Sequence, residues 1–73
     1  MNGPSVEETG TVRWFNPERG YGFIAPNGGG RDVFVHVSAL ERSGIEGLSE
    51  GQTVVVDVVA GRKGPEAASV RLI

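Results

Sequence analysis

Apolar and polar residues alternate in short segments of the chain, and glycine, proline or asparagine separates one segment from the next. Alternation with a period of two is typical of β-strands, because successive side chains of a strand point to opposite faces. The separating residues favour turns, since they adopt the backbone angles that tight turns require. We therefore predict five strands, over residues 10–16, 21–25, 32–37, 52–59 and 67–72.

The longest connection between predicted strands, residues 38–51, begins with a helix-start signal. Its first four residues, Ser-Ala-Leu-Glu, fit a capping box, which predicts a short helical turn starting at Ser38. Gly44 and Gly47 prevent a long helix, because glycine lowers helix stability. Before the first strand, residues 1–8 show no sustained period, so we expect a flexible N-terminal tail there.

The 73 residues of the chain suffice for one small domain, which we place at residues 9–73. Five short strands joined by glycine-rich turns are compatible with a sandwich or a small barrel. A barrel is favoured at this length, because closure of the sheet removes its exposed edges. We therefore predict an all-β domain in which five antiparallel strands form a closed barrel.

The parity of residues 32–37 predicts which side chains fill the barrel. One face of this strand is formed by valines alone: Val33, Val35 and Val37. The other face carries Phe34 and His36. Valines suit a narrow interior, whereas burial of His36 would require a hydrogen-bond partner for its imidazole ring. We therefore expect the valines inside and the two rings outside.

The strand over 21–25 extends the same outer surface. With Ile24 in the core, antiparallel pairing sets four rings side by side on the outside: Tyr21, Phe23, Phe34 and His36. An exposed aromatic ring forgoes roughly 1.5–3 kcal/mol of burial. A small domain has little stability to lose, so such exposure indicates a functional surface.

Trp14 and Phe15 complete the set of aromatic residues, all of which lie within residues 14–34. Because these two are adjacent, regular alternation directs one inward and one outward, and it places Trp14 on the side of Val12. A surface role for both requires a bend or bulge of the strand, which we expect near the Asn-Pro pair at 16–17.

The charges are unevenly distributed along the chain. A net charge of −2 and an isoelectric point near 5.2 argue against a wholly basic nucleic-acid binder. Three arginines nevertheless lie among the aromatic residues: Arg13, Arg19 and Arg31. Rings beside cations form a stacking surface for unpaired bases, and these arginines, together with Lys63, are candidates for phosphate contacts.

Other chemistries lack the residues that they need. With no cysteine and one histidine, the chain offers neither a metal-ligand set nor a nucleophile with an adjacent base. Residues 20–25 match the dinucleotide-binding pattern G-x-G-x-x-A, but that motif must open a helix, and here it lies within a strand. No apolar run approaches the roughly 20 residues that span a bilayer. We expect no enzyme activity, no cofactor, no metal and no membrane partner.

Residues 10–72 resemble the cold-shock domain. Residues 19–24 (Arg-Gly-Tyr-Gly-Phe-Ile) resemble the first ribonucleoprotein motif of that family, and residues 33–37 (Val-Phe-Val-His-Val) resemble its second. Residues 10–16 (Gly-Thr-Val-Arg-Trp-Phe-Asn) are similar to its opening strand, and Gly64-Pro65 together with Ala67-Ala68 are similar to its closing segment. These matches occur in the family's order over most of the chain.

The resemblance implies an OB-fold barrel that binds single-stranded RNA and DNA. It implies that bases stack on six side chains: Trp14, Phe15, Tyr21, Phe23, Phe34 and His36. It also implies that three cationic side chains contact the nucleic-acid backbone: Arg13, Arg19 and Lys63. Known members act as RNA chaperones and as regulators of transcription and translation, mostly in the bacterial cytoplasm. We therefore expect a cytoplasmic, monomeric RNA chaperone.

Two positions depart from the family pattern. Many members carry an aromatic residue where this chain has Val37, and another where it has Ile45, so we expect a shorter stacking surface. An alternative function is a barrel whose aromatic patch docks a partner protein, although the interleaved arginines favour nucleic acid. A hydrolase built on His36 and Asp32 is disfavoured, because their positions in one strand are too far apart for a hydrogen bond.

Overall fold

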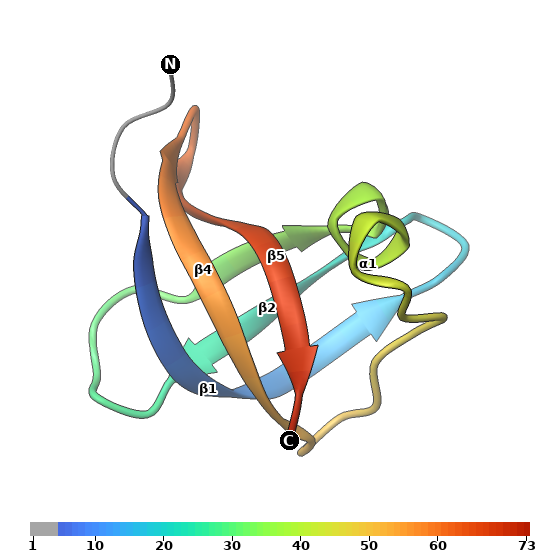
Figure 1. The fold of residues 1–73 in the computed structure, drawn as a ribbon, viewed down its shortest axis with the longest axis horizontal. Coiled ribbons are helices and arrows are strands. Elements are labelled where there is room, and N and C mark those ends of the chain that lie inside the picture. Colours follow the sequence, from blue (N-terminus) through green and yellow to red (C-terminus); the bar gives the residue numbers. More distant parts are fainter. Residues whose placement is uncertain (1–4) are drawn as a thin grey trace.

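Five strands close into a barrel in the computed structural model, which describes residues 5–73 (Figure 1). The elements follow in the order β1 (Val6–Asn16), β2 (Tyr21–Pro26), β3 (Val33–His36), α1 (Val37–Ser43), β4 (Thr53–Gly61) and β5 (Gly64–Leu72). Around the barrel the order is β1-β2-β3-β5-β4, and β4 pairs with β1 to complete the ring. The prediction of an all-β, five-stranded barrel is confirmed.

One junction of the barrel is parallel. The strands are antiparallel at the other four junctions, whereas β3 and β5 run in the same direction where they meet. An odd number of strands makes one such junction unavoidable, because strict up-and-down alternation around a closed ring requires an even number. The parallel contact is limited to the pair Phe34 and Glu66, and the predicted antiparallel barrel did not include it.

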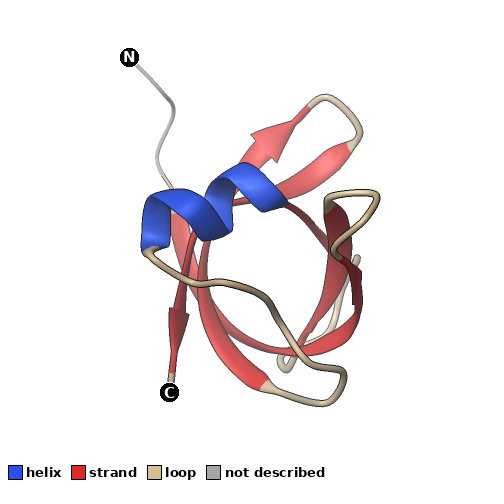
Figure 2. Cartoon of the chain, turned by 90° about the vertical axis from the view of Figure 1, so that its right-hand side faces the viewer, coloured by secondary structure: helices blue, strands red, loops and turns tan. Residues whose placement is uncertain are grey.

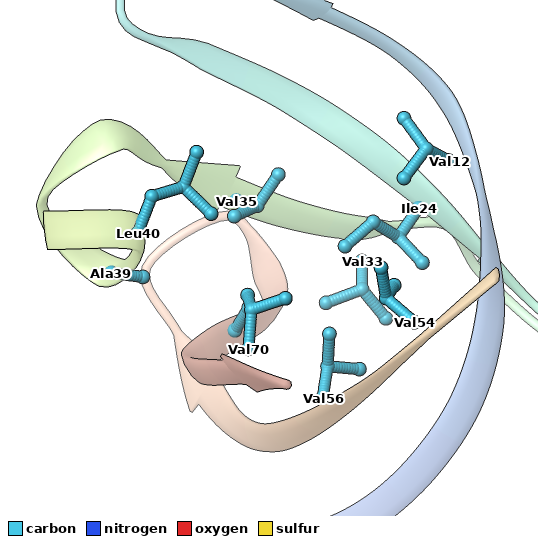
Figure 3. Close-up of a cluster of buried hydrophobic side chains, with 10 residues drawn as sticks. Val12, Ile24, Val33, Val35, Ala39, Leu40, Val54, Val56 and Val70 are labelled. Carbon is cyan, nitrogen blue, oxygen red and sulfur yellow. The ribbon is translucent and has the colours of Figure 1, made fainter. Parts of the chain in front are cut away.

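The barrel interior is filled by aliphatic side chains from all five strands and from α1 (Figure 3). The buried cluster consists of Val12, Ile24, Val33, Val35, Ala39, Leu40, Val54, Val56, Ala67 and Val70. Val33 and Val35 point inward from β3, as their valine face predicted, and Ile24 joins them from β2. Within residues 5–73 every aromatic side chain is exposed or only half-buried, so the core is built without rings.

β1 begins at Val6, inside the segment predicted as a flexible tail. Its first residues, 6–8, pair with residues 56–58 of β4. The sequence pattern around residues 6–8 did not indicate a strand, because the strand there is defined by a partner from the distant β4. Residues 1–4 of the predicted tail lie outside the described residues.

α1 begins earlier than the predicted helical turn, and its N-cap is His36 rather than Ser38. The backbone N–H of Ser38 donates a hydrogen bond of 3.1 Å to His36 Nδ1, so the imidazole ring satisfies a donor that the helix start leaves free. Val37, expected in the third strand, is the first residue of α1. Figure 2 shows α1 against one side of the ring of strands, where it adds Ala39 and Leu40 to the core.

The end of α1 returns the chain to the barrel. Gly44 has a φ of 74°, a left-handed conformation that glycine adopts without strain. The N–H of Gly44 donates to the carbonyl of Glu41, and the N–H of Ile45 donates to the carbonyl of Leu40, which is the pattern of a Schellman motif. Ile45 consequently packs against the buried cluster. Across residues 5–73 there is no helix long and apolar enough to cross a membrane.

A bulge in β5 changes which of its residues face the core. Alternation predicted that three residues share one face: Ala68, Val70 and Leu72. The buried residues are instead Ala67 and Val70, while Leu72 is 48% exposed. Adjacent residues of β4 pair with Ser69 and Ala67, which leaves Ala68 between them without a partner. The extra residue reverses the parity of the strand, and regular alternation cannot anticipate it.

Candidate nucleic-acid interface

The outer faces of β1, β2 and β3 carry a continuous group of rings. Trp14 of β1 lies opposite Phe23 of β2, which lies opposite Phe34 of β3. Tyr21 of β2 lies opposite His36 of β3. We name this surface the aromatic platform and define it by Trp14, Tyr21, Phe23, Phe34 and His36. The outward orientation predicted for the rings of β2 and β3 is confirmed, because the residues that alternate with them are buried.

Neighbouring rings of the aromatic platform contact one another, mostly edge to face. The ring centroid of Trp14 lies 5.5 Å from those of Tyr21 and Phe23. The centroid of Phe34 lies 5.8 Å from that of Phe23 and 5.7 Å from that of Tyr21. His36 extends the group, with its centroid 6.4 Å from that of Phe34. Aromatic pairs of this kind contribute about 0.5–1.5 kcal/mol each beyond their buried area, so the platform is formed before any ligand binds.

A β-bulge at Arg13 turns Trp14 outward. Val12 pairs with Ile24, but the next pair along β1 joins Trp14 to Phe23, so Arg13 has no partner in β2. Regular alternation would place Trp14 on the side of Val12, which is 1% exposed, whereas Trp14 is 41% exposed. The bulge was expected further along the chain, near residues 16–17, and its position at Arg13 corrects that expectation.

Phe15 lies apart from the platform. Its side chain is half-buried and packs against the buried cluster. Phe15 pairs with Gly22 of β2, where the two strands approach closely. A Cβ atom at Gly22 would overlap the carbonyl oxygen of Trp14 and lie 2.7 Å from the Cα of Phe15. Glycine is therefore required at this crossing, because any side chain would push β1 and the Trp14 ring away.

The cations predicted to meet phosphates lie around the platform in different settings. Arg13 Nε forms an ion pair of 2.7 Å with Asp32 Oδ2, and the side chain of Arg13 remains 58% exposed. Arg19 is exposed in the turn between β1 and β2. The side chain of Asn16 organises this turn, since its Oδ1 accepts hydrogen bonds from the backbone N–H groups of Glu18 and Arg19, at 2.9 and 3.0 Å. The Asn-Pro pair was the sequence signal for that turn.

Lys63 lies beside the Phe34 end of the platform. It lies in the tight turn between β4 and β5, and this turn stands beside Phe34. A groove of about 190 Å³ separates them, lined by Phe34, Arg62, Lys63, Gly64, Pro65 and Glu66. Sequence reasoning did not include Pro65 and Glu66 in the site, because only the parallel contact of β3 with β5 brings them next to Phe34.

The described residues around the platform offer aromatic and charged side chains to a ligand. Within residues 5–73 no three side chains of histidine, aspartate and glutamate are grouped so that they could hold a metal ion. Every buried side-chain nitrogen or oxygen of these residues has a hydrogen-bond partner. What the surface offers to a ligand is therefore ring faces, the imidazole of His36 and the surrounding guanidinium and ammonium groups.

Comparison with known proteins agrees with a barrel that carries an aromatic surface for a nucleic acid. Residues 8–73 match the family model described as the 'Cold-shock' DNA-binding domain. The chain belongs to the cold-shock domain family. The cold shock protein ScoF of Streptomyces coelicolor is 52% identical over 62 residues, which cover 85% of this chain and 92% of ScoF. CspLB of Listeria monocytogenes, a cold shock-like protein, is 54% identical over 63 residues, covering 86% of this chain and 94% of CspLB.

Membership of the family agrees with the closed five-stranded barrel and identifies the chain as a nucleic-acid-binding domain. The cold shock protein CapA of Pseudomonas fragi is also similar, with 52% identity over 63 residues, 86% of this chain and 98% of CapA. In this cold-shock domain, both departures from the family pattern lie in or directly after α1. Val37 is half-buried in the first turn of α1, and Ile45 packs against the core. Neither extends the platform.

Proposed function

We propose that this cold-shock domain binds single-stranded RNA and DNA by stacking unpaired bases on the aromatic platform. The observation that carries the proposal is the separation of residue types: the core is entirely aliphatic, while five adjoining rings occupy one outer surface. A small domain that leaves rings uncovered loses stability that burial would supply, and a stacking ligand explains the loss.

Stacking favours single strands over duplexes. A base stacked on an aromatic ring contributes about 1–3 kcal/mol to binding, and every base has a π-face, so the platform tolerates many sequences. Bases in a duplex already stack on each other, and their faces are not accessible to side chains. Three rings at the centre of the platform, Tyr21, Phe23 and Phe34, touch one another and provide a continuous track for consecutive bases.

The cations at the platform's margin supply the second part of the binding energy. Arg13, Arg19 and Lys63 approach it from β1, from the β1–β2 turn and from the β4–β5 turn. Contacts to phosphates release counterions, so binding weakens as salt rises, with a slope of about −0.7 per phosphate neutralised on a single strand. The net charge of −2 leaves little attraction elsewhere on the protein, so we expect binding to depend on the platform.

The biological role that we propose is that of an RNA chaperone and a regulator of transcription and translation, acting as a monomeric binding protein rather than as an enzyme. A protein that binds only unpaired segments shifts a weak hairpin toward its open state by mass action, because binding stabilises that state alone. This activity needs no nucleotide hydrolysis.

A titration followed by tryptophan fluorescence tests the proposal. Trp14 is the only tryptophan and lies within the platform, so a stacked base quenches its emission directly. We expect an oligothymidine to quench it in a salt-dependent manner, and a duplex of equal length to do so far less. No quenching by the single strand would contradict single-strand binding and favour the docking of a protein chain on the platform. Equal affinity for the duplex would contradict the stacking of unpaired bases.

A second experiment tests the chaperone role by itself. An RNA hairpin with a short stem, carrying a fluorophore and a quencher at its ends, brightens when it opens. We expect the wild-type domain to open the hairpin in proportion to the amount bound, and the Phe34→Ala variant to do so only at higher concentration. Tight binding to single strands without any hairpin opening would refute the chaperone role and leave the binding proposal intact.

A further inference from the structure

Arg31 connects two turns that lie far apart in the sequence. It follows the glycine-rich turn between β2 and β3, and its Nη2 donates a hydrogen bond of 3.0 Å to the backbone carbonyl of Lys63, in the turn between β4 and β5. From the sequence, Arg31 is predicted only as a candidate for a phosphate contact. In the folded chain, one of its donors is used to hold a neighbouring turn.

The guanidinium group of Arg31 also lies directly against the backbone of Gly64. A Cβ atom at Gly64 would be 2.7 Å from Arg31 Nη2 and 2.9 Å from Arg31 Cζ. Gly64 has a φ of 130°, a conformation that residues with side chains rarely adopt. The absence of a side chain therefore makes room for the guanidinium group, so the hydrogen bond and the packing at Gly64 both join Arg31 to the same turn.

The turn that Arg31 holds is the one that presents Lys63 beside Phe34. Strand pairing anchors the turn at its base, where Gly61 pairs with Gly64, and Glu66 two residues further on meets Phe34. Lys63 itself is exposed at the tip. A flexible lysine on a free tip pays an entropic cost when a ligand orders it, and prior fixation of the backbone reduces that cost.

We propose that Arg31 is a positioning residue: it holds the backbone of the β4–β5 turn so that Lys63 meets a nucleic-acid phosphate next to the base stacked on Phe34. This inference rests on the proposed function. Arg31 acts through Lys63 and contributes no phosphate contact of its own.

A double-mutant cycle distinguishes positioning from direct contact. We expect Arg31→Leu to weaken the binding of an oligothymidine roughly threefold to tenfold, the range of one hydrogen bond. In the Lys63→Met background, the same substitution should have only the effect of losing one charge from this region. Arg62→Leu measures that charge effect, because Arg62 lies in the same turn and, among the described residues, its side chain forms no hydrogen bond or ion pair.

The outcomes of the cycle distinguish a positioning role of Arg31 from a direct phosphate contact, and both from a failure of the proposed function. Strong coupling between Arg31 and Lys63 supports positioning. Additive losses, or a salt slope that falls by a further ~0.7 with Arg31→Leu in the Lys63→Met background, would show that Arg31 contacts phosphate itself and would overturn the inference. If the wild-type chain failed to bind oligothymidine, the proposed function would be wrong instead.

A measurement on the free protein tests whether Arg31 fixes the backbone of the β4–β5 turn. In wild-type protein, we expect low mobility of the Lys63 and Gly64 amides on the picosecond to nanosecond timescale, measured by heteronuclear NMR relaxation. Arg31→Leu should raise the mobility of these two amides and leave those of β2 unchanged. Equal mobility in both proteins would overturn the inference, because Arg31 would then not restrict the turn before the nucleic acid binds.

Discussion

The Phe23→Ala variant separates the aromatic platform from the core. Phe23 and Ile24 are neighbours in β2 with opposite orientations, since Ile24 is 0% exposed and Phe23 is half-buried on the outer surface. The Phe23 ring contacts three other rings, with centroids 5.5 Å (Trp14), 5.8 Å (Phe34) and 6.4 Å (Tyr21) away. The substitution therefore removes a stacking surface and three ring contacts, and it leaves the interior of the barrel filled.

The size of both effects follows from these contacts. Loss of one base–aromatic stack should weaken binding by about 1–3 kcal/mol, which is roughly fivefold to 150-fold in the dissociation constant. Three ring contacts of about 0.5–1.5 kcal/mol each should lower the free energy of unfolding by about 1.5–4.5 kcal/mol. A fully buried phenylalanine would cost about 3–5 kcal/mol; the two ranges overlap, so the affinity of the folded protein distinguishes the two cases.

The assay must report binding without relying on the altered ring cluster. Trp14 touches Phe23, so its fluorescence changes with the substitution, and the anisotropy of a labelled oligothymidine is the better signal. Urea unfolding gives the stability of each variant. Ile24→Val is the matched control: it should cost about 0.5–1.5 kcal/mol of stability and leave the affinity of the folded protein unchanged.

Two results would refute this reasoning. A stability loss of about 3–5 kcal/mol in Phe23→Ala, with unchanged affinity per folded molecule, would make Phe23 a core residue. A loss of affinity in Ile24→Val as large as that in Phe23→Ala would mean that binding follows overall stability and does not depend on the exposed ring.

Three further substitutions test other parts of the structure. Gly22→Ala should destabilise the protein by about 1–3 kcal/mol or more in urea unfolding. Gly28→Ala is the control and should not, because no atom lies within 4 Å of its added Cβ. Equal stabilities of the two variants would contradict the close crossing of β1 and β2. Arg19→Ala should weaken oligothymidine binding and reduce the magnitude of the salt slope by about 0.7, and an unchanged slope would remove Arg19 from the phosphate contacts. Ile45→Ala should lower the free energy of unfolding by about 1–2 kcal/mol, below the range for a fully buried residue, with unchanged affinity; weaker binding would instead place Ile45 in the interface.

Much of the candidate site was predictable because β2 and β3 are regular strands. Their side chains alternate without interruption, so the choice of Ile24, Val33 and Val35 for the core directs their neighbours outward. The turn between them is short, which makes antiparallel pairing the simple expectation. The burial patterns of both strands agree with that local reasoning.

Errors arose where a strand departs from regular alternation. The bulge at Arg13 moves Trp14 to the outer surface. In β5, Ala68 has no partner in β4, and Ala67 lies in the core where Ala68 was predicted. One extra residue in a strand reverses the face of every residue after it. Bulges depend on how two strands cross, as at the crowded contact of Gly22 with β1, and a pattern along one strand carries no such information.

The sequence by itself determined the number and order of the strands, the aliphatic character of the core and the outward rings of β2 and β3, because these follow from the alternation of neighbouring residues. Only the tertiary structure decided the parallel junction of β3 with β5, the capping of α1 by His36 and the hold of Arg31 on the Lys63 turn. The junction and the Arg31 contact join segments that are distant along the chain. The His36 contact is local, but it forms only because β3 ends where the helix starts.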